Sequence, residues 1–336
     1  MYHNDSYVLR ELVILSNNFN IYKPFDESLQ SVSHYFSSFA LHNSIEHKSF
    51  IVNEQLVRYM IVLTDGRICT CSDDHTISVI DIENDKIDMT IEGHTKPVYS
   101  LCQLENGKVL SGSVDKSIKI WEVGKDRYKC ESTIETEGEV REIVRISNNR
   151  IAFSHKNPYI YIWDMRTNFD KKNIKELKGH KGSRMETMIY MKEKDYLIAG
   201  YNNKIVTIWC MKTYQSVFSI KGIALNIGKV LCDLDEETFA IGGYDCIAII
   251  NVKKGEITQQ AKINVINANI TSMIKLRDNK RILCGCRTGN FLVFDYQNST
   301  MNLISTSNNG WIEGLHNINK ETFITCSSNY LKIWKY

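Results

Sequence analysis

The chain has 336 residues, of which 43% are hydrophobic and 24% are charged, and its formal net charge at pH 7 is +2. A balance this close to neutral gives no reason to expect nucleic acid or an anionic membrane as the main partner. The length exceeds what one hydrophobic core usually spans, yet only three prolines occur and no glycine- and serine-rich linker divides the chain. Composition therefore favours an array of repeated units over two unrelated domains.

The ten cysteines show no Cys-x-x-Cys spacing, and most of them stand in apolar, β-branched stretches. We interpret them as buried free thiols of a reducing compartment. Cys69 and Cys71 share one strand face, as do Cys284 and Cys286, but no clustered histidine completes a metal site. We therefore expect neither a metal nor another cofactor.

The chain start lacks the pattern of a signal peptide, and no apolar run reaches the length of a membrane span. We expect no membrane insertion and a cytoplasmic location, with the nucleus as the alternative.

Residues 1–47 differ from the rest and are predicted to form a partly helical extension. After Pro24, Asp26 is a candidate cap for a helix that reaches about Leu41. Its apolar residues recur at helical spacing: Phe25, Leu29, Val32, Phe36 and Phe39. We interpret this stripe as a face that packs on the rest of the protein, and a docking or self-association helix is the alternative.

From about residue 48 onward, a strand pattern recurs with a period near 40. Each unit contains a short apolar strand such as IKIWE, IYIWD or VTIWC, as expected for strands buried between neighbouring sheets. One position in that strand recurs at separations of 41, 42, 46, 41, 44 and 40 residues. It is held by Ile80, Trp121, Trp163, Trp209, Ile250, Phe294 and Trp334. The spacing predicts seven units of three or four strands.

The second unit, residues 92–123, has the clearest local pattern. Gly93 and His94 form a turn, Glu105-Asn106-Gly107 is a hairpin signal, and Asp115-Lys116 makes a second tight turn. The order Gly-His, Ser, Asp and Trp resembles the WD repeat, the unit of a β-propeller. This resemblance covers roughly the last 290 residues. It implies an all-β fold, a seven-bladed WD-repeat propeller at residues 48–336.

The resemblance also implies a structural hydrogen-bond network among His94, Ser111, Asp115 and Trp121. These residue types also occur in hydrolytic triads, but a serine inside a strand and a histidine used by the tryptophan leave no nucleophile in a pocket. Phosphate-binding loops and the HExxH and GxSxG motifs are absent from the sequence. We therefore predict that the protein is not an enzyme, and a propeller enzyme is the last-ranked alternative.

The seventh unit ends after its third strand at Tyr336, and Ser49-Phe50-Ile51-Val52 precedes the first unit. We predict that a strand at about residues 48–53 supplies the missing outer strand, because this pairing removes two exposed edges.

The family binds partners through loops on its top face, so the resemblance implies candidate contacts there. One set precedes the inner strands: Lys96, Glu139, Arg184, Asn226, Asn269 and Trp311. The other flanks the turn-aspartate positions: His155, Lys156, Tyr201, Tyr244 and Arg287. Trp311 lies outside the usual tryptophan position, and we predict that it is exposed. The alternative is that it fills the mouth of the channel.

The segment Trp163-Asp164-Met165-Arg166 resembles the WDxR ending of propellers that serve as substrate receptors of cullin-RING ubiquitin ligases. That resemblance implies an adaptor contact by Arg166 on the underside, and a solvated arginine after a strand is the alternative. The sequence thus predicts a non-catalytic scaffold for protein or peptide partners, with a ligase receptor as the alternative. No nucleic-acid partner is expected.

Overall fold

The computed structural model describes residues 45–221, 227–244, 246–263, 269–304, 310–319 and 322–335. The chain divides into two compact units, residues 1–43 and 44–336, and the description concerns the second. The helix predicted from Asp26 to about Leu41 lies outside the described residues.

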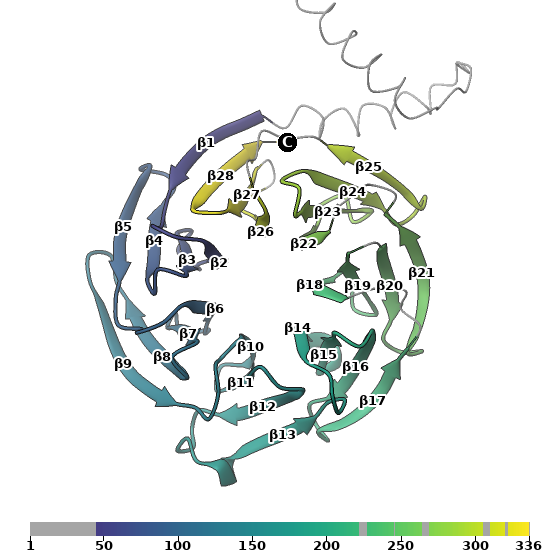
Figure 1. Ribbon diagram of the computed structural model, residues 1–336, viewed down its shortest axis with the longest axis horizontal. Helices are drawn as coiled ribbons and strands as arrows, with labels where there is room; N and C mark the ends of the chain where they lie inside the picture. Colours follow the sequence, from purple (N-terminus) through teal and green to yellow (C-terminus); the bar gives the residue numbers. More distant parts are fainter. Residues whose placement is uncertain are drawn as a thin grey trace, which may run out of the picture. The chain divides into compact units, whose positions relative to one another are not determined.

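Seven four-stranded antiparallel sheets are arranged in a ring in the described part of the chain, and Figure 1 shows this ring. The inner strands are β2 (Val57–Val62), β6 (Val98–Gln103), β10 (Glu142–Ser147), β14 (Met185–Met191), β18 (Ile227–Asp233), β22 (Ile270–Lys275) and β26 (Ile312–Asn317). The second strands are β3 (Ile68–Ser72), β7 (Val109–Ser113), β11 (Arg150–Ser154), β15 (Tyr196–Tyr201), β19 (Thr238–Gly243), β23 (Arg281–Cys286) and β27 (Thr322–Ser327).

The third strands are β4 (Ile77–Asp81), β8 (Ser117–Val123), β12 (Tyr159–Asp164), β16 (Ile205–Cys210), β20 (Cys246–Asn251), β24 (Phe291–Asp295) and β28 (Tyr330–Lys335). The outer strands are β5 (Lys86–Ile91), β9 (Tyr128–Glu135), β13 (Ile174–Lys178), β17 (Gln215–Ile220), β21 (Glu256–Lys262), β25 (Thr300–Ile304) and β1 (Ile45–Ile51). Two short 3₁₀ helices, η1 (Lys171–Asn173) and η2 (Lys192–Lys194), lie in loops. Blades are numbered 1 to 7 in this order, starting with β2–β5, and the predicted seven-bladed fold is confirmed.

Blade 7 combines strands from the two ends of the propeller. Strand β1 pairs antiparallel with β28, from Ile45 opposite Lys335 to Ile51 opposite Tyr330. The backbone of Val52 continues this contact by donating from its N–H to the Asn329 carbonyl over 3.0 Å. The outer edge of β28 is therefore covered, which removes an exposed row of backbone donors and acceptors.

The hydrophobic core is divided into layers between neighbouring blades. Between blades 1 and 2, for example, Cys69, Ile77 and Val79 belong to the same buried cluster as Leu101 and Trp121. Second and third strands are covered on both faces, which explains their continuous apolar runs. The ten cysteines are free thiols; most are buried in these layers, whereas Cys130 is exposed on β9. Burial raises the pKa of the Cys69 thiol to about 12, so it stays protonated.

A β-bulge lies near the start of the inner strand in five blades. The pairing with the second strand shifts register there and leaves one residue between two paired neighbours. A bulge of this kind leaves the extra residue unpaired and re-aims its side chain. The five bulge residues, one from each of blades 1, 2, 4, 6 and 7, are Arg58, Tyr99, Glu186, Thr271 and Glu313.

Candidate functional site

Two sets of loops meet on one side of the ring: those that precede the inner strands and those that join second to third strands. Backbone hydrogen bonds tie the two sets together. These bonds run from Asp73 N to Leu56 O (3.0 Å), Val114 N to Pro97 O (3.0 Å), Asn202 N to Arg184 O (3.0 Å) and Arg287 N to Asn269 O (2.8 Å). We call the surface formed by these loops the top face. These bonds hold the described parts of the two sets of loops against one another.

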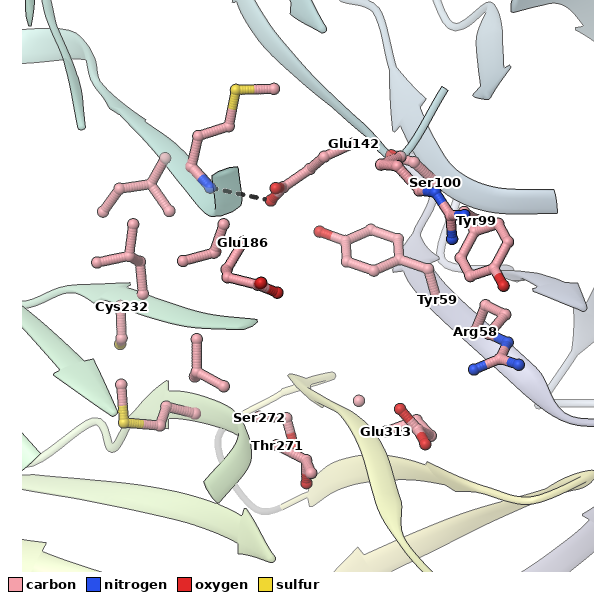
Figure 2. Close-up of a pocket in the computed structure, with 18 of the residues that line it drawn as sticks. Arg58, Tyr59, Tyr99, Ser100, Glu142, Glu186, Cys232, Thr271, Ser272 and Glu313 are labelled. Atoms are coloured by element: carbon pink, nitrogen blue, oxygen red, sulfur yellow. Dashed lines mark hydrogen bonds between the residues drawn. The ribbon is translucent and has the colours of Figure 1, made fainter. Parts of the chain in front are cut away.

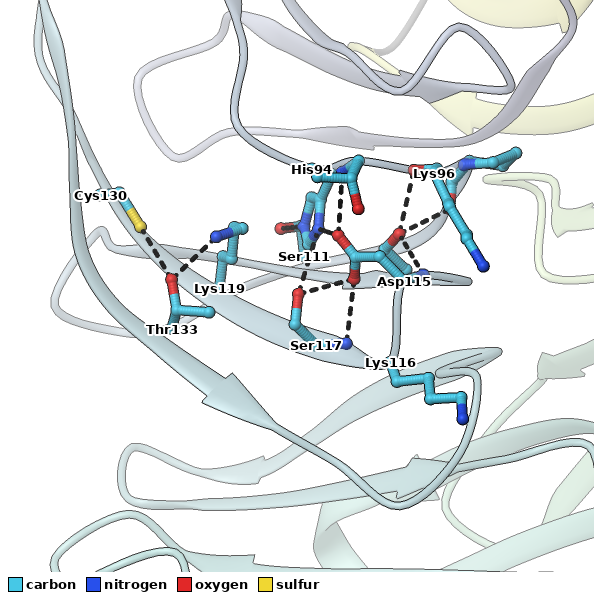
Figure 3. Close-up of polar contacts among 12 residues, drawn as sticks. His94, Lys96, Ser111, Asp115, Lys116, Ser117, Lys119, Cys130 and Thr133 are labelled. Atoms are coloured by element: carbon cyan, nitrogen blue, oxygen red, sulfur yellow. Dashed lines mark hydrogen bonds and ion pairs between the residues drawn. The ribbon is translucent and has the colours of Figure 1, made fainter.

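Blade 2 contains a continuous polar chain that runs from this face into the sheet. The Trp121 indole N–H donates to Ser111 Oγ over 2.8 Å, and Ser111 Oγ lies 2.6 Å from His94 Nε2. His94 Nδ1 lies 2.7 Å from Asp115 Oδ2, and Asp115 also accepts from Ser117 Oγ over 2.7 Å, as Figure 3 shows. Each buried side-chain polar atom in this blade 2 network therefore has a hydrogen-bond partner, as low-dielectric interiors require.

The bonding pattern defines the protonation state of this chain. Burial lowers the pKa of His94 and outweighs the opposing effect of Asp115, so the ring is neutral near pH 7. Burial acts to raise the pKa of Asp115, but hydrogen bonds from Ser117 and His94 leave that pKa below its usual value. An ionised Asp115 then accepts the His94 Nδ1–H, and Ser111 donates its hydroxyl proton to Nε2. Ser111 is buried, and its hydroxyl both accepts from Trp121 and bonds His94, so it does not face solvent as a nucleophile.

Blades 1 and 7 use different residues for the same purpose. In blade 1, Asn53 stands at the histidine position; it accepts from Thr70 Oγ1 over 3.0 Å and donates to Ser78 Oγ over 3.2 Å. In blade 7, the Trp334 indole donates to Thr325 Oγ1 over 3.0 Å. Sequence reasoning missed Asn53, although an amide with one donor and one acceptor group is a chemically sound replacement for neutral imidazole.

The central channel opens onto the top face and has a volume of about 980 Å³. Its lining includes the five bulge residues, together with Tyr59, Arg141 and Glu142. Figure 2 shows Tyr59 and Glu186 pointing toward the channel, while Glu142 accepts from the backbone N–H of Met188 over 3.2 Å. Tyr59 is 39% exposed, so its side chain is open to the space of the channel. The mouth is thus polar and charged, whereas blades 4 to 6 contribute apolar wall such as Met188, Cys232 and Met273.

Two cations contact one aromatic ring across the mouth of this channel. The guanidinium carbons of Arg58 and Arg141 lie 5.1 and 4.5 Å from the centre of the Tyr99 ring. Asp73 binds Arg58 through Nε at 2.7 Å, and Glu139 binds Arg141. These contacts link blades 1, 2 and 3, and they neutralise both guanidinium groups within the protein itself.

The structure places most of the sequence-predicted top-face residues at the surface. Lys96, Lys156, Arg184, Tyr244, Arg287 and Trp311 are exposed, while Glu139 and Asn269 are half-buried. Asn226 lies outside the described residues. Trp311 is 42% exposed and has the Arg287 guanidinium 3.5 Å from its ring centre. The structure thus brings these two candidates together from neighbouring blades.

Two of the predicted contacts are not available to a partner. Tyr201 is fully buried and packs edge-on against His180, with ring centres 5.1 Å apart. His155 is buried beside Tyr161 at 4.7 Å and Phe153 at 5.6 Å. In both cases a neighbouring aromatic ring packs against the side chain and helps to bury it, so we remove these two residues from the candidate contacts.

The residues that sequence reasoning missed at the channel mouth are the bulge residues Arg58, Tyr99, Glu186 and Glu313. Each of them is the second residue of its inner strand, as in Val57-Arg58 and Ile312-Glu313, and this position is the signal that the sequence offers. A period-two pattern assigns that residue to an alternating strand face, and only the pairing register reveals the bulge.

On the opposite side of the ring, Arg166 follows the third strand of blade 3. Its side chain is 69% exposed and forms a bidentate pair with Asp164, with Nε to Oδ1 at 2.9 Å. This hydrogen bonding with Arg166 lowers the pKa of Asp164 to about 2. The arginine of the WDxR segment is therefore presented to solvent in a defined orientation.

Within the described residues, no three or more His, Cys, Asp and Glu side chains gather as a group that could hold a metal ion. The same part of the chain contains no helix of the length and apolarity needed to cross a membrane.

Comparison with known proteins matches residues 86–122 to the family model "WD domain, G-beta repeat". The "WD repeat-containing protein pop2" of Schizosaccharomyces pombe is 22% identical over 202 residues, which are 51% of this chain and 28% of that protein. The "Nuclear distribution protein nudF" of Aspergillus niger is 26% identical over 156 residues, 45% of this chain and 34% of nudF. A "Putative E3 ubiquitin-protein ligase LIN-1" of Lotus japonicus is 30% identical over 94 residues, 27% of this chain and 6% of that protein. The match thus spans about a third or less of each of these relatives.

Proposed function

The chain belongs to the WD-repeat propellers, and we propose that it is a non-catalytic scaffold that holds a protein or peptide partner against its top face. Propellers of this family generally serve as scaffolds for protein interactions. That this chain binds a partner on its top face is our proposal. A rigid disc with loops on one face suits this task, because little ordering cost is left for binding.

The observation that carries the proposal is the exposure of large side chains on braced loops. Trp311 is 42% exposed and Tyr244 is 46% exposed, and both precede or join strands at the top face. Tyrosine, tryptophan and arginine dominate binding hot spots because they combine large area with hydrogen-bonding groups. The channel mouth beside them adds charged side chains that would form a polar rim.

Affinity capture with the full chain, followed by mass spectrometry, tests this proposal. We expect Trp311→Ala and Tyr244→Ala to lose partners that the unaltered chain retains, with unchanged thermal unfolding. Val217→Ala is the matched control, since Val217 is similarly exposed but lies on the outer strand β17. Retention of every partner by both top-face variants would rule out this face as the binding surface.

A substrate receptor of a cullin-RING ubiquitin ligase is the second candidate. It is favoured by the exposed Arg166, which Asp164 holds in one orientation. Recovery of a cullin adaptor by the unaltered chain and its loss in Arg166→Ala would support this role. Lys172→Ala is the control, because Lys172 is a nearby exposed cation paired with Asp170. Absence of any such adaptor from the captured proteins would count against it.

A further inference from the structure

Arg287 and Trp311 form a stacked pair at the junction of blades 6 and 7. Arg287 lies in the turn between β23 and β24, and Trp311 directly precedes β26. The guanidinium carbon is 3.5 Å from the centre of the Trp311 ring, so the cation lies against the indole face. Both side chains are exposed on the top face.

Hydrogen bonds hold the described backbone at Arg287 and at Ile312, which follows Trp311. Arg287 N donates to Asn269 O over 2.8 Å, and Gly289 N closes the turn by donating to Cys286 O over 3.0 Å. Next to Trp311, the carbonyl of Ile312 accepts from Ser272 Oγ of blade 6 over 3.3 Å. These bonds hold the described backbone at Arg287 and next to Trp311 before a ligand arrives, which reduces the ordering cost of binding.

Arg287 differs in its contacts from the three arginines that line the channel. Arg58, Arg141 and Arg184 each form an ion pair with a carboxylate of the protein: Asp73, Glu139 and Glu186, respectively. Across the described parts of the chain, no ion pair or side-chain hydrogen bond reaches the Arg287 guanidinium. Its in-plane N–H groups are accordingly available to an external acceptor, while the ring occupies one flat face.

We propose that Arg287 and Trp311 form a receptor for the carboxylate of an aspartate or glutamate in the protein partner, an inference that rests on the proposed top-face function. A guanidinium donates two parallel N–H bonds to a planar carboxylate, which gives the contact geometric specificity. Stacking on the indole covers one flat face of the guanidinium and leaves its in-plane donor edge free of the ring. The single positive charge of the stacked guanidinium matches the single negative charge of one carboxylate.

Trp311 offers a direct readout, because Trp121, Trp163, Trp209 and Trp334 are buried. Iodide quenches tryptophan fluorescence according to both the exposure of the indole and the local concentration of anions, whereas neutral acrylamide depends on exposure alone. The ratio of the two therefore reports the local anion concentration at the exposed indole. We expect Arg287→Gln to lower the iodide-to-acrylamide quenching ratio at least about twofold. Arg277→Gln, which removes the same charge from an exposed residue of blade 6 between β22 and β23, should leave the ratio unchanged. Trp311→Phe should remove the iodide-sensitive component in the otherwise unaltered chain.

Ligand chemistry is tested by nuclear magnetic resonance of the indole N–H groups. The probe is the capped peptide Gly-Glu-Gly-Glu-Gly, with its glutamine and phosphoserine counterparts at the same ionic strength. We expect the glutamate peptide to shift the Trp311 signal saturably, and Arg287→Gln to abolish the shift. Arg277→Gln should retain it. The proposal fails if the glutamate peptide causes no saturable shift, if the shift survives in Arg287→Gln, or if the phosphoserine peptide binds more tightly.

The same variants separate this inference from the broader function. Partner capture that is lost in Trp311→Ala but retained in Arg287→Gln overturns the carboxylate receptor and leaves the top-face scaffold in place. Capture that is retained in both variants, and in Tyr244→Ala, overturns the scaffold proposal itself.

Discussion

Trp334 donates its indole N–H to the hydroxyl of Thr325 across 3.0 Å, and both side chains are buried. Thr325 lies two residues beyond Phe323, the residue directly opposite Trp334 in the sheet. Ser111 has the same relation to Val109, which lies opposite Trp121. The hydroxyl that satisfies the buried indole is therefore set by strand register, and either serine or threonine supplies it.

Replacing Thr325 with valine should destabilise the protein. Valine keeps the shape of threonine but leaves the Trp334 N–H buried without an acceptor, which costs about 1 to 3 kcal/mol in the free energy of unfolding. Denaturant unfolding measures this loss. Thr325→Ser keeps the hydroxyl and is the control for chemistry, so it should lose less. Equal losses in the two variants would mean that packing of the methyl group, and not the hydrogen bond, is what matters.

Replacing Asp115 with asparagine should also lower the free energy of unfolding, by about 1 to 3 kcal/mol, with no loss of any catalytic activity. Asp115 accepts from Ser117 Oγ and the Thr95 N–H as well as facing His94 Nδ1, and an amide replaces one acceptor oxygen by a donor. Urea unfolding of Asp164→Asn provides the comparison, because that carboxylate lies at the surface with Arg166. Surface changes of this kind usually stay within about 0.5 kcal/mol. Hydrolytic turnover that depends on Ser111 would contradict the structural role.

Stability should fall as the pH is lowered from 7 to 5, and His155 should contribute to the fall. Burial lowers the pKa of His155 from 6.5 to about 4, against a small opposing effect of Glu137. Between pH 6.5 and pH 4, His155 is therefore protonated in the unfolded chain and neutral in the folded chain. The stability that His155 contributes is fully present above pH 6.5 and is lost as the pH falls toward 4. This linkage amounts to about 1 to 2 kcal/mol between pH 7 and pH 5.

His155→Phe tests this assignment, since phenylalanine keeps an aromatic ring beside Tyr161 and has no nitrogen to protonate. Unfolding free energies at the two pH values should differ less for the variant than for the unaltered chain. An identical pH dependence would assign the effect to other histidines such as the buried His94 and the half-buried His316, whose pKa values desolvation also lowers.

The period of about 40 residues was enough to predict the seven blades, because burial of the third strands on both faces leaves a repeated apolar run. The top-face surface was harder to predict. Tyr201 and His155 stand where the family exposes loop residues, but neighbouring rings bury them. Arg58 and Tyr99 could not be predicted as channel-mouth residues from the sequence. A bulge is a property of strand pairing, and the sequence of one strand does not define its register with the partner strand. Pairs such as Arg287 and Trp311 come from loops of different blades, so only the closed ring reveals their contact.

Deleting the chain through Asn53 should cost far more stability than deleting residues 1–20. Strand β1 pairs with β28 at six positions, and at about 1 kcal/mol for each backbone hydrogen bond the loss is on the order of 5 kcal/mol. The deletion also removes Asn53, which bonds Thr70 and Ser78 in blade 1, and exposes the edge of β28. Thermal unfolding of the two truncated chains, compared with the full chain, gives the two losses. If they are equal, β1 does not hold the ring closed, and pairing of β28 with β1 contributes little to the stability of the propeller.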